Sequence, residues 1–382
     1  MIEWTPTRLG NVLKYEQPTK YIVASTQYKD SYSTPVLTAG QSFILGHTNE
    51  ENNIFSEVPV IIFDDFTTAI KYVDFPFKVK SSAMKILKNN KEVSDIRFLF
   101  YLMKTLKTDS ERHKRYWIST YAELKIPLPP LDQQKKIAAI LDAADAYRQK
   151  TKALITKYEE LTQSLFLDMF GDPVENTKGW KVKDLKDLTS KIHSGNTPKG
   201  GSKVYVNEGI TFFRSQNVWK NNIVLDGVAY IDDATHKSMM KSSLRHKDIL
   251  MTKTGRINTE NSSLGRAAMY LGADDRANVN GHVYLIRLNE GVNNEFVLHI
   301  LTSKEYRGHI RSVCVGGIDK RQLNKGHIED FPIISPPKEI QEKFIENLLI
   351  IRDHKDKLKL SLAQSEDLFN SLLQRAFKGE LS

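Results

Sequence analysis

Two segments of about forty residues share one pattern of apolar positions. In each segment apolar or small residues recur at alternating steps of three and four, which is the period of a helix with one buried face. The first stripe comprises Ile137, Ile140, Ala144, Tyr147, Thr151, Leu154, Tyr158, Leu161 and Leu165, and the second comprises Phe344, Leu348, Ile351, Leu358, Leu362, Phe369 and Leu372, with Lys355 and Ser365 interrupting it. At 1.5 Å per residue each segment predicts a helix of roughly 60 Å. We expect the two stripes to bury each other.

The two segments are copies of one repeat. Pro129-Pro130 recurs as Pro336-Pro337, an offset of 207 residues, and the register then holds without a gap. The matched pairs are Asp132 with Glu339, Gln134 with Gln341, Lys136 with Lys343, Leu141 with Leu348, Glu159 with Glu366, Leu161 with Leu368, Ser164 with Ser371, Leu165 with Leu372 and Phe170 with Phe377. Upstream, residues 125–128 align with residues 330–333, and Trp4, Leu9 and Val12 match Trp180, Leu185 and Leu188 in spacing. The alternative is that each helix covers its own domain, as amphipathic helices usually do.

The segments between the helices have the pattern of mixed α and β structure. Short apolar runs bounded by turn residues predict strands at 59–63, 77–79, 210–213, 248–251 and 282–286, and helices are expected near 94–107 and 294–311. The predicted fold class is α+β: two mixed α/β domains separated by two long antiparallel helices that form an intramolecular coiled coil, with a pseudo-two-fold repeat. The predicted boundaries are 1–130 for the first domain, 131–170 for the central helix, 171–337 for the second domain and 338–382 for the C-terminal helix.

Charge placement favours a polyanionic partner for the two domains. The net charge is +9, with 40% hydrophobic and 26% charged residues over 382 residues. Residues 1–130 carry 17 Lys and Arg against 14 Asp and Glu, and residues 171–337 carry 24 against 18, whereas the helices at 131–170 (6 against 6) and 338–378 (8 against 7) are nearly neutral. Cys314 is the single cysteine, so no internal disulfide can form, and the sequence shows neither a signal peptide nor an apolar span. A cytoplasmic protein is expected.

This layout resembles the specificity subunits of type I restriction-modification systems. The likeness covers nearly the whole chain and rests on residues 126–134 with the helix that follows, on residues 323–337 ahead of the second helix, and on three shorter pieces, 38–40, 80–83 and 194–198. After the strand at 59–63 the family commonly has Gly-Asp-His-Thr, whereas this chain has Asp64-Asp65-Phe66-Thr67, which leaves the role of Phe66 open.

The resemblance implies a partner for each part of the chain. Each domain would be a target-recognition domain that reads one half of an asymmetric, bipartite site in double-stranded DNA. The helices would set the distance between the half-sites and dock two methyltransferase subunits, which carry S-adenosylmethionine and link the chain to the restriction and translocase subunits. This chain itself would bind no cofactor.

Candidate DNA contacts are polar or basic side chains in segments with the composition of loops. Arg, Lys, Asn, Gln and Thr match the donors and acceptors of the major groove, and glycine lets the backbone approach phosphates. A solvated surface role is the competing interpretation for each of them. The candidates are Thr38, Gly40, Gln41, Thr67, Thr68, Lys114 and Arg115 in the first domain, and Arg214, Gln216, Asn217, Lys253, Arg256, Lys320 and Arg321 in the second.

Catalytic and metal sites are not expected. The ten histidines and one cysteine lack paired ligand spacing, and the sequence contains no phosphate-binding loop and no aminomethyltransferase motif. Asp172, Asp184 and Lys186 faintly resemble a nuclease triad, but such triples are common in polar sequence. Two alternatives stay open: a coiled-coil adaptor that binds no DNA, and a specificity subunit of a related type IIB-like system. A fused nuclease and methyltransferase is disfavoured by the missing motifs.

Overall fold

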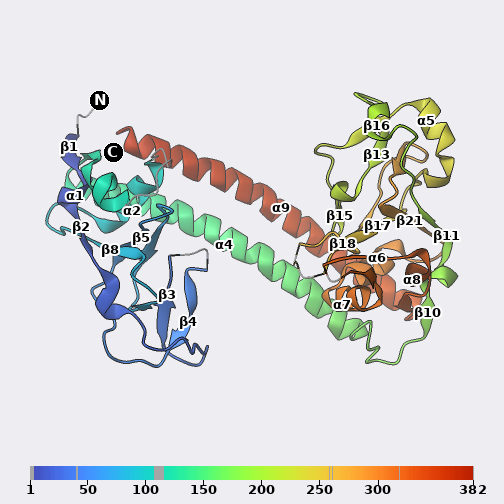
Figure 1. Ribbon diagram of the computed structural model, residues 1–382, viewed down its shortest axis with the longest axis horizontal. Coiled ribbons are helices and arrows are strands. Elements are labelled where there is room, and N and C mark those ends of the chain that lie inside the picture. The colour runs from blue at the N-terminus through green and yellow to red at the C-terminus, as the bar shows by residue number, and fades with distance from the viewer. Residues whose placement is uncertain are drawn as a thin grey trace. The chain divides into compact units, whose positions relative to one another are not determined.

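The computed structural model describes residues 4–39, 42–106, 116–257, 259, 261–317 and 319–381. The chain divides into two compact units, which we call unit 1 (residues 1–155 with 357–382) and unit 2 (residues 156–356). Each unit combines two main sheets with helices (Figure 1). Candidates Gly40, Gln41, Lys114 and Arg115 lie outside the described residues.

Unit 1 is built on the antiparallel sheet β2-β8-β5-β6 and the smaller sheet β4-β3-β7. Strand β5 is buried along its whole length because alternate side chains enter two cores: Ile61 and Phe63 pack with helix α2, and Val60 and Ile62 pack with Phe77. The elements are β1 (Thr5–Arg8), α1 (Leu9–Val12), β2 (Leu13–Glu16), η1 (Pro18–Tyr21), β3 (Thr34–Leu37), β4 (Ile44–Thr48), β5 (Val60–Asp64), β6 (Ile70–Val73), β7 (Lys78–Val79), β8 (Met84–Asn89), α2 (Ile96–Thr105), α3 (Tyr116–Ser119), η2 (Tyr121–Glu123) and β9 (Lys125–Leu128).

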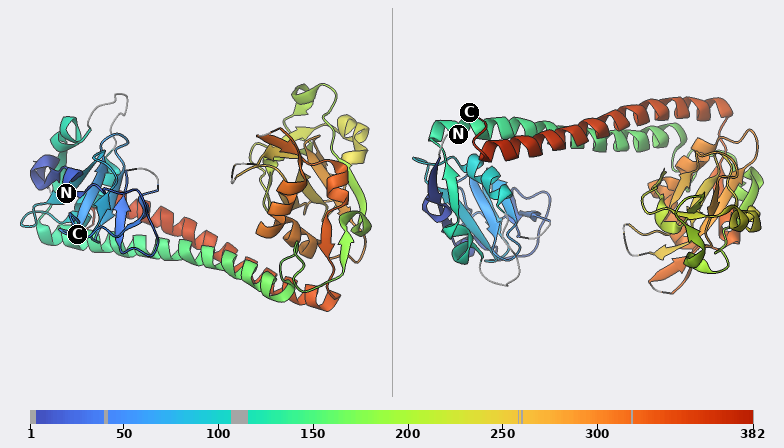
Figure 2. Two further views of the ribbon diagram at one scale, coloured as in Figure 1. Left: turned by 60° about the horizontal axis from the view of Figure 1, so that its bottom comes forward. Right: turned by 90° about the horizontal axis from the view of Figure 1, so that it is seen from above.

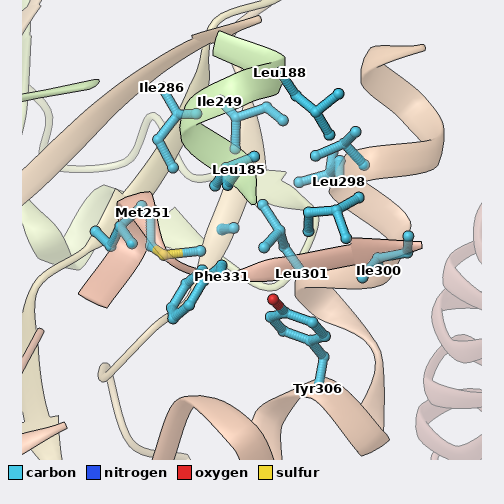
Figure 3. Close-up of a cluster of buried hydrophobic side chains, with 14 of the residues drawn as sticks. Leu185, Leu188, Ile249, Met251, Ile286, Leu298, Ile300, Leu301, Tyr306 and Phe331 are labelled. Atoms are coloured by element: carbon cyan, nitrogen blue, oxygen red, sulfur yellow. The ribbon is translucent and has the colours of Figure 1, made fainter. Parts of the chain in front are cut away.

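Unit 2 is built on the sheets β11-β21-β17-β19 and β12-β16-β13-β20. Its main core lies between the first sheet and helices α6 and α7, where apolar side chains from η3, β17, β21 and α6 converge on Tyr306 and Phe331 (Figure 3). The elements are β10 (Val182–Asp184), η3 (Leu185–Leu188), β11 (Thr189–Ser194), η4 (Gly201–Val204), β12 (Tyr205–Val206), β13 (Ile210–Phe213), η5 (Ser215–Asn217), β14 (Val218–Trp219), β15 (Asn222–Ile223), β16 (Ala229–Ile231), α5 (Asp233–Ser238), η6 (Met240–Ser242), β17 (Ile249–Thr252), β18 (Thr254–Arg256), β19 (Ala267–Met269), β20 (Ala277–Val279), β21 (Val283–Leu288), α6 (Asn294–Thr302), α7 (Lys304–Val313), β22 (Val315–Gly316), β23 (Lys320–Gln322), α8 (Lys325–Glu329) and β24 (Pro332–Ile334).

The two units repeat the same strand pairings. Six pairings of unit 1 (β1 with β9, β2 with β8, β5 with β8, β5 with β6, β3 with β4, and β3 with β7) have counterparts in unit 2 (β10 with β24, β11 with β21, β17 with β21, β17 with β19, β13 with β16, and β13 with β20). In both units the last of these pairs is parallel and the other five are antiparallel. The internal repeat therefore extends from the helices through the sheets.

The structure corrects the alignment of the segment before each helix. Pro6 pairs with Pro127 in unit 1 and Val182 pairs with Ile334 in unit 2, which makes residues 125–128 equivalent to 332–335 rather than to 330–333. A second equivalence agrees: the Leu9 amide donates to the Leu124 carbonyl, and the Leu185 amide donates to the Phe331 carbonyl, each at 2.9 Å. The 207-residue offset thus holds upstream of the prolines as well. The sequence alignment was wrong because it matched Pro127 with Pro332. The strand pairing shows that Ile334 takes the place in unit 2 that Pro127 takes in unit 1.

Most predicted elements are confirmed, with one helix divided. The five strand predictions correspond to β5, β7, β13, β17 and β21, and the helix near 94–107 is α2. The helix expected at 294–311 is instead two helices, α6 and α7, because Ser303 is extended and its side chain accepts a hydrogen bond from the Tyr306 amide at 3.2 Å.

The repeated segments form helices α4 (Leu131–Phe170) and α9 (Lys338–Phe377), whose bounds also differ by 207. Each helix has one part in unit 1 and one part in unit 2. Within unit 1 Lys152 contacts Glu366 at 2.8 Å and Arg148 stacks on Phe369, and within unit 2 Glu159 contacts Lys355 and Phe166 packs on Phe344. In both units the residue numbers rise along one helix as they fall along the other. The helices are therefore antiparallel in each unit, and Figure 2 shows them side by side in both views.

The buried face of α9 agrees with the prediction, and that of α4 agrees in part. Ser365 is buried and continues the α9 stripe instead of interrupting it. On α4, Ile137 and Thr151 are buried as expected, but Ile140, Tyr147, Leu154 and Leu161 are exposed. The positions beside them, Leu141, Arg148, Ile155 and Thr162, are buried or partly buried. The prediction failed there because it selected apolar letters, whereas the helix buries an arginine whose guanidinium lies 4.3 Å from the Phe369 ring centre and bonds to Asp145.

The repeated glutamines bind the turn before each helix. Gln134 is fully buried and its Nε2 donates to the Pro129 carbonyl at 2.7 Å, while the Gln341 Nε2 donates to the Pro336 carbonyl at 2.8 Å. Gln134 makes two further bonds, accepting from the Asp95 amide at 2.8 Å and donating to the Val93 carbonyl at 3.0 Å. Gln134 thereby ties helix α4 to the start of α2, because Asp95 is the N-cap residue of α2.

An acidic side chain, Glu16, secures the end of strand β2 to strand β8. Burial by itself raises the pKa of this carboxyl, but hydrogen bonds from Lys88, Tyr21 and Lys20 outweigh burial and lower the pKa to about 2. Lys88 lies 2.6 Å from Glu16, and the Tyr21 hydroxyl donates to Glu16 at 2.7 Å. The ionised form of Glu16 is therefore the form that the fold stabilises.

Candidate nucleic-acid interface

In unit 1 the structure brings two candidate residues from different turns together. Thr38 follows β3, and Thr67 lies in the turn between β5 and β6. Both line one pocket of about 550 Å³, which we call hollow 1. The walls of hollow 1 are mostly apolar, with one carboxylate and one lysine; its lining residues are Thr38, Ala39, Phe43, Ile62, Asp64, Thr67, Ala69 and Lys71.

The turn between β5 and β6 is held in one conformation by Asp64. The Asp64 carboxylate accepts from the Phe66 amide at 2.9 Å and from the Thr67 hydroxyl at 2.6 Å, and the Asp64 carbonyl accepts from the Thr68 amide at 2.9 Å. Thr68 has a φ of 61°, a backbone conformation that β-branched residues rarely adopt. The Thr67 hydroxyl is thus engaged within the turn, and the Phe66 ring is left 68% exposed beside it.

The candidates Arg214, Gln216 and Asn217 of unit 2 lie around the short helix η5. Asn217 is fully buried: its side chain accepts from the Arg214 amide at 3.0 Å and donates to the Val224 carbonyl at 3.0 Å. The structure does not support direct DNA contact by Asn217. Its side-chain amide is already bonded to backbone groups of the segment between β13 and β16, and these bonds hold that segment in position. The Arg214 side chain is partly buried and donates to the Gly227 carbonyl, whereas Gln216 is exposed.

Four further candidates of unit 2 converge on one small sheet and its approach. The segments around Arg256 and Lys320 were expected to be loops, but they form the sheet β18-β23-β22. Arg256 pairs with Lys320 across this sheet, and Gly255 pairs with Arg321. Arg256 and Lys320 are exposed, and Lys253 precedes β18 with its ammonium 5.7 Å from the Tyr284 ring centre. Backbone pairing thus brings Lys253 and Arg256 close to Lys320, which is more than sixty positions away in the sequence.

One acidic residue moderates this basic group. The Arg256 guanidinium lies 3.3 Å from the Asp319 carboxylate, and both side chains are about two-thirds exposed. An ion pair so open to solvent contributes little to stability, and another anion can readily replace Asp319 as the partner of Arg256. Arg256 therefore stays available to a phosphate or a guanine edge.

Sequence reasoning missed a cation–aromatic pair in unit 2. The Arg266 guanidinium lies 3.9 Å from the Trp219 ring centre, and Trp219 is 41% exposed. Both residues line a pocket of about 290 Å³, which we call hollow 2, whose lining residues are Trp219, Lys220, Asn222, Val224, Asn261 and Arg266. The partners are 47 positions apart with no shared motif, so the sequence alone carried no signal for the pair.

Hollow 1 and hollow 2 occupy equivalent places in the repeat. Hollow 1 lies between the β3–β4 and β5–β6 connections, and hollow 2 lies between the β13–β16 and β17–β19 connections. The strands that these connections join are paired in the same way in both units. The same position on one fold therefore carries an apolar pocket in unit 1 and an aromatic, amide-lined pocket in unit 2.

Groups suited to metal binding are absent from the part of the chain that the structure describes: no cluster of three or more His, Cys, Asp or Glu side chains occurs there. Lys186 forms ion pairs with Asp184 and Asp330, while the Asp172 carboxylate accepts from the Val174 amide within a turn. Asp184 and Lys186 thus pair with each other, but Asp172 is bonded within its own turn, so the three do not form a triad. None of the described helices combines the length and apolarity needed to span a bilayer.

The architecture defines a class of protein in which one α+β unit occurs twice and is completed each time by two repeated helices. The family model for the type I restriction modification DNA specificity domain matches residues 1–162 and 177–359, which is most of the chain. The chain belongs to this family. The resemblance seen in the sequence is therefore confirmed.

Known relatives and solved structures agree with this family. The chain is 43% identical over 211 residues to the EcoR124I/EcoR124II specificity subunit of Escherichia coli, and that alignment spans 52% of this chain and half of the relative's length. It is 24% identical to the MjaVIII specificity subunit of Methanocaldococcus jannaschii over 97% of this chain and 92% of the relative. The fold is similar to that of the S subunit of a type I restriction-modification system from M. genitalium, with a TM-score of 0.62 at 15% identity, covering 98% and 96% of the two chains.

Proposed function

We propose that this chain is the DNA sequence-recognition subunit of a type I restriction-modification complex. Each unit reads one half of a bipartite, asymmetric site, and the chain docks methyltransferase subunits, through which restriction subunits join the complex. The observation that carries this proposal is the form of the duplication: six strand pairings and the helix register repeat, whereas the connections around hollow 1 and hollow 2 differ. A repeated frame with different contact surfaces is what recognition of two unlike half-sites requires.

The helices α4 and α9 supply the common frame in this proposal. The length of these helices sets the distance between the half-sites, because a continuous helix has a fixed rise per residue. The exposed apolar residues Ile140, Tyr147 and Leu154, seven positions apart on the unit 1 part of α4, support a docking role for that face. Tyr147 also contacts α9, because its hydroxyl lies 3.0 Å from the Ser361 hydroxyl, but 56% of the tyrosine stays exposed.

Mapping of DNA methylation tests the proposal. Cells that express the partner methyltransferase subunit with this chain should carry methylation at one split, non-palindromic motif, and cells that lack the chain should carry none at that motif. Single-molecule sequencing of genomic DNA reads both outcomes. Methylation at the same motif without the chain would refute the recognition role and favour the adaptor alternative.

The chain is proposed to supply no chemistry of its own. Purified alone, it should transfer no methyl group from S-adenosylmethionine to DNA, because S-adenosylmethionine is bound by the partner methyltransferase subunits. A radiolabelled methyl-transfer assay with and without the partner subunit measures this. Methyl transfer by the rigorously purified chain would contradict the assignment.

A further inference from the structure

The walls of hollow 2 carry the groups that distinguish an A·T base pair in the major groove. Trp219 presents one apolar ring to solvent, while Asn222 and Asn261 lie on opposite connections around the same pocket. Both asparagines are exposed, and neither side-chain amide has a hydrogen-bond partner among the described residues. An asparagine amide pairs with the adenine N6 and N7 atoms, and the thymine methyl is the one apolar group that the major groove displays.

The position of Trp219 is fixed from two sides. It ends strand β14 of a tight hairpin with β15, and the amide of Asn221, the second residue of the turn, donates to the Ala267 carbonyl of β19 at 2.7 Å. Beneath the ring, Arg266 is only 7% exposed, and its guanidinium donates to the carbonyls of Ser262 (3.0 Å) and Asn261. The ring is therefore held before any ligand arrives, which reduces the entropy cost of contact.

Arg266 also gives the pocket a positive charge. Among the described residues no carboxylate lies within ion-pair distance of it, and burial lowers the pKa of its guanidinium, which reflects the cost of keeping this charge out of water. A buried cation without an acidic partner is unfavourable for stability alone. Beside a polyanion the same charge attracts the ligand.

We propose that hollow 2 reads one A·T base pair, with Trp219 contacting the thymine methyl, the asparagine amides contacting adenine, and Arg266 positioning the tryptophan. This inference rests on the proposed function, since it names the base pair that one unit recognises. Hollow 1, at the equivalent place, lacks a stacked arginine and lines its walls with Phe43, Ile62 and two alanines, so the two units differ in what they read.

Thymine-to-uracil replacement tests the methyl contact, because uracil lacks only that methyl. The wild-type complex of the full chain with its methyltransferase subunit should lose about 5-fold to 10-fold in affinity when one particular thymine of the mapped site is replaced. Trp219→Ala should bind the unmodified site about 10-fold more weakly and should lose nothing further at that thymine. Trp219→Phe should restore part of the sensitivity to uracil.

Two matched controls separate contact from structure. Leu225→Ala removes another exposed apolar side chain from the same connection and should change neither affinity nor uracil sensitivity. Arg266→Lys keeps the charge but loses the planar stack, and it should reduce uracil sensitivity without altering discrimination at the other half-site. The salt dependence of binding should be the same for Trp219→Ala as for the wild type, because tryptophan neutralises no phosphate.

Several outcomes would overturn the assignment. If the wild type and Trp219→Ala are equally sensitive to uracil at every thymine, Trp219 does not contact the base. The same conclusion follows if Trp219→Ala loses discrimination in both half-sites together. If the wild-type complex itself shows no sequence preference, the proposed function fails instead, so the two failures are distinguishable.

Discussion

The repeated glutamines offer a stability test in which the chain supplies its own control. Gln134 is buried with three hydrogen bonds, whereas Gln341, at the same place in the repeat, is half-buried with one. Gln134→Ala leaves the Asp95 amide and the Val93 carbonyl without these partners inside the protein. Since an unsatisfied buried group costs about 1–3 kcal/mol, the free energy of unfolding of unit 1 should fall by about 2–4 kcal/mol. Gln341→Ala loses one bond and should lower the stability of unit 2 by about 1 kcal/mol.

Hydrogen exchange followed by mass spectrometry is the suitable assay, because a chain with two units need not unfold in one step. In Gln134→Ala the amides of α2 should exchange about 30-fold faster or more, since each 1.4 kcal/mol corresponds to a factor of ten. The amides of α6, the equivalent helix of unit 2, should not change. Equal effects of the two substitutions, or a change in α2 of less than about five-fold, would refute the reasoning that the extra bonds of Gln134 connect α2 to α4.

Three further predictions follow from the basic sheet, the helices and the Glu16 carboxylate. Arg256→Ala should weaken specific DNA binding by about 1–3 kcal/mol while Asp319→Ala does not, as measured by titration at several salt concentrations; unchanged affinity and salt dependence would remove Arg256 from the interface. Inserting one heptad after Thr151 and one after Leu362 lengthens each helix by about 10 Å, so methylation mapping should find the same half-sites about three base pairs further apart. The pKa of Glu16 is lowered to about 2, so its contribution to stability is present above pH 4.5 and is lost as the pH falls from 4.5 toward 2, and Glu16→Gln should flatten this part of the acid denaturation curve.

The sequence predicted the helices and the duplication well because both are long, regular patterns. A stripe maintained over forty residues and a shared Pro-Pro-x-x-x-Gln element leave few alternatives. The buried face of α4 was harder to predict, because its partly buried positions include Arg148 and Thr162, which a hydrophobic pattern excludes. The partial burial of Arg148 depends on contact with Phe369, which lies on a helix more than 200 residues away.

The interface was predicted less completely, for physical reasons. Strand β18 is defined by pairing with β23, more than sixty positions away, and the Gly-containing sequence of β18 and of β22 indicates a loop. Asn217 is a residue type that often contacts bases, but its side chain is buried and bonded within the fold. Trp219 is a residue type that often lies in a core, but it is exposed. The tertiary structure determines which polar side chain is already hydrogen-bonded and which aromatic ring stays exposed to solvent.

Unit 1 is made of two separate segments of the chain, which affects the order in which the units can fold during synthesis. Unit 2 is one continuous stretch, residues 156–356, whereas unit 1 joins residues 1–155 with residues 357–382. Phe369 and Ala376 of α9 are buried in the same core as Phe98 and Leu141, so this core is incomplete until that part of α9 has left the ribosome. Unit 1 begins to be made before unit 2 and is therefore completed after it. A chain released before α9 is made would keep an apolar face of α2 and α4 uncovered, which gives the cell's proteases and chaperones a means to distinguish it from a chain that includes α9.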